Sequence, residues 1–174
     1  MIMSDSEITW ISTYGGRFIA LPDSSLAMWQ GFPDDGRGPL DTSHDYGRAC
    51  DTIGYATTLQ VGETTALVFG ENDYGGVYSE DQIPLIFEWV YADSADDVLR
   101  AIKELPQSLH SDSTLKFKVE SDHLNVFDSA FAGCEYESQH SCRFSIKPGH
   151  YSVASTLYEP SENIRLIIHR FLRD

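Results

Sequence analysis

Residues 83–106 read IPLIFEWVYADSADDVLRAIKELP, an apolar run followed directly by an amphipathic segment. Only Glu88 interrupts the run over 83–91, which is typical of a strand buried on both faces. Ser94 then stands where a helix cap is expected, and Pro106 would end that helix. The apolar residues between them recur at helical spacing and would share one face: Val98, Leu99, Ile102 and Leu105. The stretch therefore predicts a buried strand and then a helix over about residues 94–105.

Most of the other periodic segments predict strands. Alternating apolar residues bounded by Gly, Pro, Ser or Asp recur about every 8–12 residues. Turn signals at Gly15-Gly16 and Ser121-Asp122 suggest that 8–21 and 114–127 each form a hairpin. The glycine- and acid-rich segments 31–42 and 71–81 are predicted to be loops. Further strands are expected at 53–61, 64–69, 142–146, 151–157 and 163–172.

These elements predict an α+β fold that is mostly β, with antiparallel sheets, one clear helix and a β-rich C-terminal lobe. Two arrangements fit the pattern. In one, an acidic α+β lobe over 1–106 is followed by a β-rich lobe over 107–174. In the other, the chain forms one continuous domain.

Negative charge is concentrated in the first part of the chain. The formal net charge is −15, and between Ala49 and Leu99 there are ten carboxylates but no lysine or arginine. Such a field repels nucleic acid and anionic membranes, and it speeds encounter with a basic partner. The plainer alternative is that the acidity serves only solubility.

The sequence gives little support for a disulfide framework, a metal or phosphate site, export or a membrane span. Three widely spaced cysteines make no disulfide framework, no histidine pair has the spacing of zinc ligands, and no glycine-rich phosphate loop is present. We therefore expect no metal and no cofactor. The first residues are acidic where a signal peptide would be basic, and no run approaches about 20 apolar residues. These features favour a cytoplasmic protein.

Two residues keep an enzymatic alternative open. Cys50 lies close in sequence to His44 and Arg48, which could activate a thiolate. His169 is the other candidate. A small cytosolic hydrolase or transferase using Cys50 or His169 is therefore the alternative to a binding protein, although no Gly-x-Ser-x-Gly nucleophile motif is present.

Two acidic loops favour recognition of a protein. Tyrosine supplies rigid contact area with a polar tip, and carboxylates complement lysine and arginine. We expect the three tryptophans, Trp10, Trp29 and Trp89, to lie in the core because their neighbours are apolar. The predicted contact residues come from segments 32–36 and 71–81: Asp34, Asp35, Glu71, Asp73, Tyr74, Tyr78, Glu80 and Asp81.

Several short motifs, read in order, resemble one known family. They are Trp10 with Gly15-Gly16, Trp29-x-Gly31, Asp45-Tyr46-x-Arg48-Ala49-Cys50, the strand 66–70, the run 89–93, Phe127-Asp128-Ser129-Ala130, Pro148-Gly149-x-Tyr151 and Leu166-x-x-His169-Arg170. Over roughly residues 10–171 the chain resembles the immunity protein 21 family of bacterial polymorphic toxin systems.

The resemblance implies a non-enzymatic cytoplasmic inhibitor, produced beside a toxin and protecting the producing cell by binding that toxin. It supplies no catalytic residue. From charge alone, the expected toxin is basic, such as a nuclease whose phosphate-binding cleft an acidic surface would occupy. The oligomeric state is left open.

Overall fold

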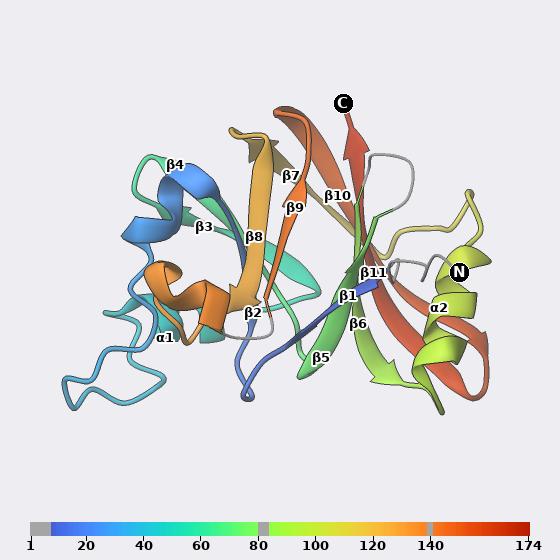
Figure 1. The fold of residues 1–174 in the computed structure, drawn as a ribbon, viewed down its shortest axis with the longest axis horizontal. Coiled ribbons are helices and arrows are strands. Elements are labelled where there is room, and N and C mark those ends of the chain that lie inside the picture. The colour runs from blue at the N-terminus through green and yellow to red at the C-terminus, as the bar shows by residue number, and fades with distance from the viewer. Residues whose placement is uncertain (1–7, 80–83, 139–140) are drawn as a thin grey trace, which may run out of the picture.

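Two antiparallel sheets form the body of the molecule, which the computed structural model describes at residues 8–79, 84–138 and 141–174 (Figure 1). The first sheet has the spatial order β1 (Ile8–Ser12), β5 (Tyr74–Tyr78), β6 (Leu85–Tyr91), β11 (Ile164–Arg173), β10 (Gly149–Ser161) and β7 (Ser113–Val119). The second has the order β3 (Ala56–Val61), β4 (Thr64–Phe69), β2 (Phe18–Pro22), β8 (His123–Asp128) and β9 (Cys142–Ser145).

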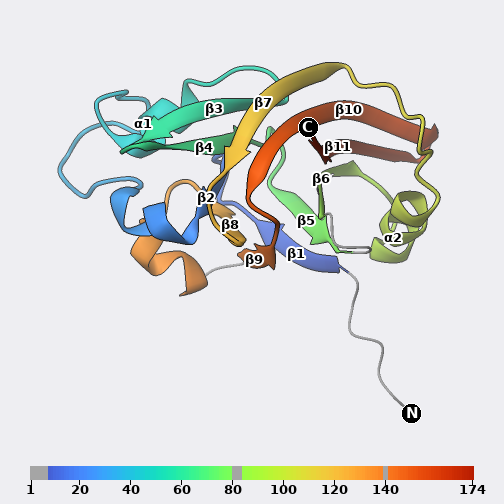
Figure 2. The same cartoon turned by 90° about the horizontal axis from the view of Figure 1, so that it is seen from above.

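The helical elements lie outside the two sheets. Figure 2 shows α2 (Ala95–Lys103) at one end of the molecule, and α1 (Asp45–Cys50) with the 3-10 helices η1 (Asp23–Met28) and η2 (Gly133–Ser138) at the other. Because the described residues form many strands and few helices, the predicted mostly-β α+β class is confirmed. Among the described residues, no helix is long and apolar enough to cross a membrane.

Strand alternation sorts the core into three layers. In β2, Phe18 and Ala20 face the other sheet, whereas Ile19 and Leu21 face outward toward Trp29. In β6, Ile86 joins the central layer between the sheets and Phe87 joins the outer layer under α2. Because successive strand residues point to opposite faces, each sheet has two apolar faces to cover. The helical elements cover the outer ones.

The predicted helix is confirmed with slightly shorter bounds. The Ser94 hydroxyl accepts a hydrogen bond from the Asp97 amide at 3.2 Å and donates one to the Asp97 carboxylate at 2.7 Å. This reciprocal cap fixes the start of α2. Its buried residues, Val98, Ala101 and Ile102, pack on the outer face of the first sheet.

Two predicted hairpins are wrong. β1 belongs to the first sheet and β2 to the second, so the Gly15-Gly16 turn carries the chain from one sheet to the other. β7 and β8 are likewise in different sheets, joined across Ser121-Asp122. The predicted loop over 71–81 is also wrong in part, because Tyr74–Tyr78 is strand β5.

Both sheets combine strands from both sides of residue 106. In the first sheet, β6 pairs with β11, and in the second, β2 pairs with β8. The central core layer draws on both sheets as well. We therefore propose that the chain folds as one continuous domain rather than as separate lobes over 1–106 and 107–174.

Candidate functional site

A buried hydrogen-bond network holds the segment that carries three of the predicted contact residues. Glu88, on β6, accepts hydrogen bonds through Oε2 from the Glu71 amide at 3.1 Å and from Asn72 Nδ2 at 3.0 Å. Its Oε1 lies 2.8 Å from His169 Nε2, and His169 Nδ1 lies 2.8 Å from the Ser155 hydroxyl. Glu88, Ser155 and His169 are each no more than 1% exposed. The network thus ties residues 71–72 to strands β6, β10 and β11.

The electrostatics of Glu88 depend on these partners. Burial by itself would raise the pKa of Glu88, because it penalises the charged form. The hydrogen bond and charge of His169, followed by the bonds from Asn72 and Glu71, outweigh burial and hold the pKa below its ordinary value. The buried carboxylate is therefore kept ionised by His169 and by two donors of the loop, the Glu71 amide and the Asn72 side chain.

The side chains next to this network are exposed to solvent at Glu71, Asp73 and Tyr74. The side chain of Glu71 is 61% exposed, with its Oε1 3.6 Å from Arg17 Nη2, and Tyr74 is 63% exposed. Asp73 is exposed, and its carbonyl accepts a hydrogen bond from the Thr13 amide at 2.8 Å. The backbone is fixed while the side chains face outward, an arrangement that suits a preformed contact surface.

A hollow of about 500 Å³ brings parts of several loops together beside these residues. Glu71 and Asp73 line it, and so do Pro39 and Leu40 from the long loop before α1. The turn between β1 and β2 and that long loop both reach the lower edge of the molecule in Figure 1. Its other lining residues are Gly15, Gly16, Arg17, Tyr46, Cys50 and Gly70.

The remaining predicted contact residues have different positions. Asp34 and Asp35 are exposed on the loop before α1 but do not line the hollow. Asp35 binds Arg37 Nε at 2.8 Å, and this hydrogen bond lowers the pKa of Asp35. Tyr78 is buried, 6% exposed, under α2, so its side chain offers no contact surface. Glu80 and Asp81 lie outside the described residues.

Sequence reasoning missed an apolar hollow that Tyr74 also borders. Trp10 and Trp89 line it, and Trp10 is 37% exposed, so its predicted place in the core is wrong. Trp29, by contrast, is fully buried, as predicted, and its indole N–H donates to the Ser129 carbonyl at 2.9 Å. No local signal marks Trp10 as exposed, because Ile11 beside it and Ile8 two residues before it are apolar and buried.

The two residues of the enzymatic alternative differ in access, because Cys50 lines the hollow of about 500 Å³ whereas His169 is fully buried. His44 caps α1, since its Nδ1 accepts from the Gly47 amide at 3.0 Å and its Nε2 lies 2.9 Å from the Gly38 carbonyl. Both ring nitrogens are therefore engaged with backbone, and neither is directed to Cys50. Ser155, His169 and Glu88 resemble a hydrolase triad in connectivity, but all three are buried, so no substrate can reach the hydroxyl.

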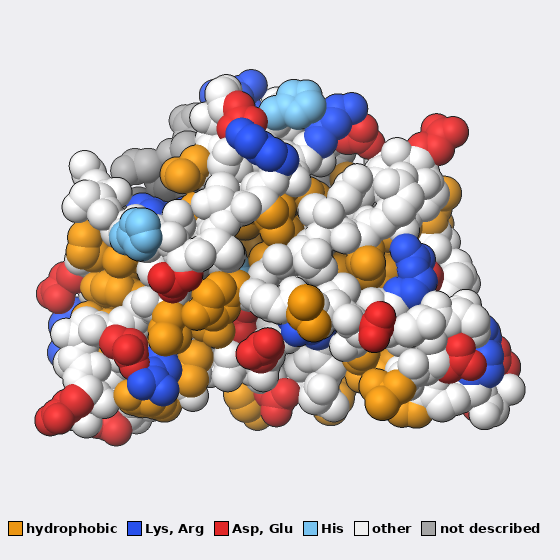
Figure 3. All heavy atoms as spheres, turned by 180° about the vertical axis from the view of Figure 1, so that it is seen from behind, with side chains coloured by type: hydrophobic (Ala, Val, Ile, Leu, Met, Phe, Trp, Pro, Cys, Tyr) orange, Lys and Arg blue, Asp and Glu red, His pale blue; other side chains and the backbone are white. Residues whose placement is uncertain are grey.

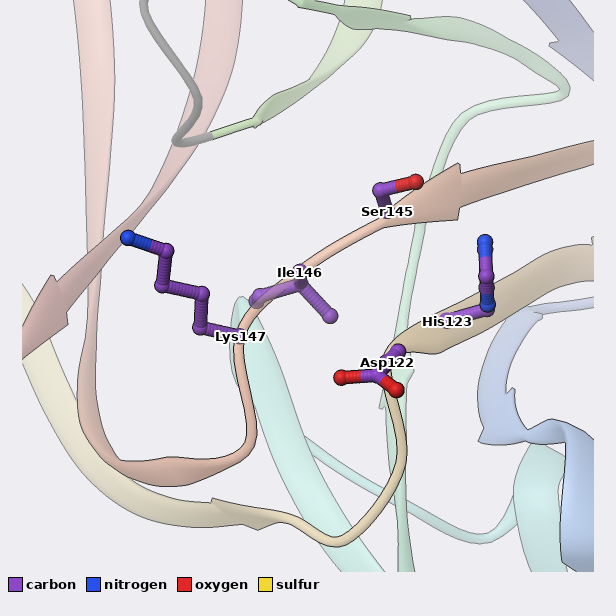
Figure 4. A pocket seen from close by; sticks show the side chains of 5 residues that line it. All are labelled: Asp122, His123, Ser145, Ile146 and Lys147. Carbon is purple, nitrogen blue, oxygen red and sulfur yellow. The ribbon is translucent and has the colours of Figure 1, made fainter.

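A smaller hollow of about 300 Å³ at the ends of β8 and β9 carries mixed charge. Figure 4 shows that the Lys147 side chain extends away from Asp122, so the two charges do not converge on a common point. His123 Nδ1 lies 4.0 Å from Asp23 Oδ2. Of the predicted contact residues that the structure describes, none lines this hollow.

Charged side chains of both signs occur on the surface. On the face seen in Figure 3, Lys, Arg, Asp and Glu side chains all occur at the upper edge, and over the lower half Asp and Glu side chains are interspersed with Lys and Arg. The lower edge is the one that the loop before α1 and the β1–β2 turn reach (Figure 1). The exposed acids Glu71 and Asp73 thus lie beside these two loops.

The comparison with protein families gives the decisive observation. The family model Immunity protein 21 matches residues 9–164 of the 174. The chain belongs to the immunity protein 21 family. Searches of the curated proteins and of the solved structures found no match. Membership confirms the resemblance seen in the sequence, and it indicates an immunity protein that binds a cognate toxin. In this family member the matched span includes Trp10, Glu71, Asp73, Tyr74 and Glu88.

Proposed function

We propose that this immunity protein neutralises its toxin by covering the toxin's active site with the acidic edge that carries Glu71, Asp73 and Tyr74. The observation that supports this most is the combination of a buried anchor and exposed charge: Glu88 and His169 fix the backbone while the carboxylates remain in solvent. A preformed surface loses less conformational entropy when it binds.

The proposed partner is a basic toxin domain, with a nuclease as the specific expectation. No lysine or arginine stands between Ala49 and Leu99, so the segment that carries Glu71, Asp73 and Tyr74 is acidic in sequence, and Arg17, 3.6 Å from Glu71, is a cation that another segment brings to it. A nuclease cleft that binds phosphates would be attracted to such a segment, which would speed association. Asp34, and more weakly Asp35 because of its bond to Arg37, would extend the edge. Glu80 and Asp81 remain predicted contacts.

Inhibition by binding requires no chemistry from this chain, and we propose that it is not an enzyme. The buried Ser155, His169 and Glu88 serve structure in this account, and so does the cap formed by His44. The proposed site of action is the cytoplasm, where a toxin would meet its target in the producing cell.

The test is protection of cells that express the toxin domain encoded beside this protein. Wild type should restore growth, and the double variant Glu71→Gln, Asp73→Asn should protect less well at equal protein level. The matched control is Glu63→Gln, Asp122→Asn, which removes the same charge from exposed positions on other turns. Equal loss of protection in both double variants would contradict the proposed edge, and failure of wild type to protect would contradict the immunity function.

A further inference from the structure

An apolar hollow of about 620 Å³ opens where β1, β5 and β6 meet the first turn of α2. It is lined by Trp10, Ile11, Ser12, Tyr74, Trp89, Val90 and Ala95. Its volume falls in the range of sites that take a small ligand or a large side chain. In Figure 1, β1, β5 and β6 lie side by side, and α2 lies beyond them at one end of the molecule.

Gly76 makes room for the ring on which Trp10, a lining residue of this hollow, packs. Gly76 pairs with Trp10 on one side and with Phe87 on the other. A Cβ at Gly76 would lie 2.7 Å from the Phe87 ring, so a larger residue there would displace that ring. Trp10 then packs edge-on to Phe87 and tilted to Trp89, each with ring centroids 5.6 Å apart. The exposed part of Trp10 is therefore held rigidly by other rings.

Rigid, partly exposed aromatic rings in a concave site are the usual anchors of protein interfaces. Tryptophan and tyrosine dominate the few positions that contribute most binding energy, and they act where a partner side chain fills the space between them. Scattered exposed apolar residues need no explanation, but Trp10, Trp89 and Tyr74 share one hollow.

Charge around the hollow indicates the chemistry of the occupant. Exposed carboxylates adjoin its lining residues in sequence: Asp73 precedes Tyr74, and Asp96 follows Ala95. Asp93, also exposed, stands in the link between β6 and α2. Four of the lining residues fall within the segment that has no lysine or arginine: Tyr74, Trp89, Val90 and Ala95. An apolar side chain flanked by cations would fit both the hollow and its acidic margin.

We propose that this hollow receives one aromatic or long aliphatic side chain from a lysine- or arginine-rich segment of the toxin. The proposal rests on the proposed function and deepens it: the acidic edge attracts the partner, and the hollow retains it. Charge at the margin would act mainly on the association rate, whereas the buried anchor would act on the dissociation rate.

A peptide titration tests the hollow without the toxin. The probe is a capped pentapeptide, Lys-Lys-Phe-Lys-Lys, followed through the three indole N–H signals in the NMR spectrum. Signals of Trp10 and Trp89 should shift, and that of the buried Trp29 should not. The control peptides Lys-Lys-Ala-Lys-Lys and Glu-Glu-Phe-Glu-Glu should each bind at least about tenfold more weakly. No shift at Trp10 and Trp89, or equal binding of either control peptide, would overturn the proposal.

Toxin binding supplies the second arm. Trp10→Ala should weaken the complex by roughly 30-fold, mostly through faster dissociation. Ala95→Met, at an exposed helix position, should weaken it too by occupying the hollow without a change of charge. The control is Leu172→Ala, which removes an exposed apolar side chain on β11.

The outcomes separate the two proposals. If Trp10→Ala and Ala95→Met leave toxin affinity unchanged while Glu71→Gln, Asp73→Asn weakens it, the hollow is not the anchor and the immunity function stands. If wild type does not bind the toxin, the proposed function fails, and the peptide titration alone decides whether the hollow takes a cation-flanked apolar side chain.

Discussion

Glu88 and His169 form a hydrogen-bonded pair between the two sheets, with 2.8 Å between Oε1 and Nε2 and neither side chain exposed to solvent. The second oxygen of Glu88 holds the backbone at Glu71, next to the residues of the proposed contact edge. A structural pair in the core thereby positions a segment at the surface. The first prediction concerns this pair.

Glu88→Gln should lower the free energy of unfolding by about 3 kcal/mol at pH 7, because removing one partner leaves a buried polar group without its charge complement. Exchange of the Glu71 amide proton should become faster, since its acceptor is weakened. Chemical denaturation and hydrogen exchange measure the two effects. Glu63→Gln, at an exposed position, should change stability by less than about 0.5 kcal/mol.

Acid should abolish the difference between wild type and Glu88→Gln. The pKa of Glu88 lies below its ordinary value of 4.5 in the folded protein, so its contribution is complete above pH 4.5 and is lost as pH falls through the folded pKa. Denaturation at a series of pH values should show wild type losing stability below pH 4.5 while the variant loses less. Parallel curves would contradict an ionised Glu88.

Gly75→Ala should destabilise the protein more than Gly76→Ala. A Cβ at Gly75 would lie 2.3 Å from the Phe87 carbonyl oxygen, which cannot move without disturbing the β5–β6 pairing. A Cβ at Gly76 meets the Phe87 ring, which can shift. We expect losses of about 3 and about 1.5 kcal/mol, measured by thermal or denaturant unfolding. Gly38→Ala, with open space around it, is the neutral control.

The Gly76→Ala variant also tests how Trp10 is packed. Gly76→Ala should also change the fluorescence of Trp10, because the Phe87 ring on which it packs is displaced. If the tryptophan spectrum and the stability are both unchanged, Gly76 does not determine the position of the Phe87 ring on which Trp10 packs.

Cys50→Ser should leave protection against the toxin intact and cost at most a modest amount of stability. Cys50 is only partly buried at the end of α1, and His44 is engaged with backbone. Growth of toxin-expressing cells measures protection. Complete loss of protection, with the variant folded and present at the wild-type level, would return attention to a chemical role for the thiol.

The sequence predicts individual helices and strands better than it predicts which strands pair with one another. The capping pair Ser94 and Asp97 lies within the sequence of α2, so the start of that helix could be predicted. Gly15-Gly16 and Ser121-Asp122 were correctly seen as turns, but a turn does not determine whether the two strands stay in one sheet. That choice depends on distant pairings such as β1 with β5 and β2 with β8.

The candidate site was predictable only where charge and exposure coincide. Glu71, Asp73 and Tyr74 are predicted contacts because acids and tyrosine are concentrated there; the structure shows them exposed, and their contact with a toxin stays a prediction. Tyr78 was expected at the surface because Gly75 and Gly76 are typical of a loop. Residues 74–78 form strand β5 instead, and Tyr78 lies on the strand face that α2 covers. The hollow around Trp10 requires the pairing of β1, β5 and β6, which no local pattern reveals.

The central claim is that this chain binds its toxin through an acidic edge. The most direct test is a titration with the C-terminal domain of the toxin encoded beside it, at low salt and at roughly physiological ionic strength. We predict tight binding at both, with association slowing as salt is added, and a smaller salt effect for Glu71→Gln, Asp73→Asn. No binding at either salt concentration would contradict the account, and tight binding indifferent to salt would contradict its electrostatic part.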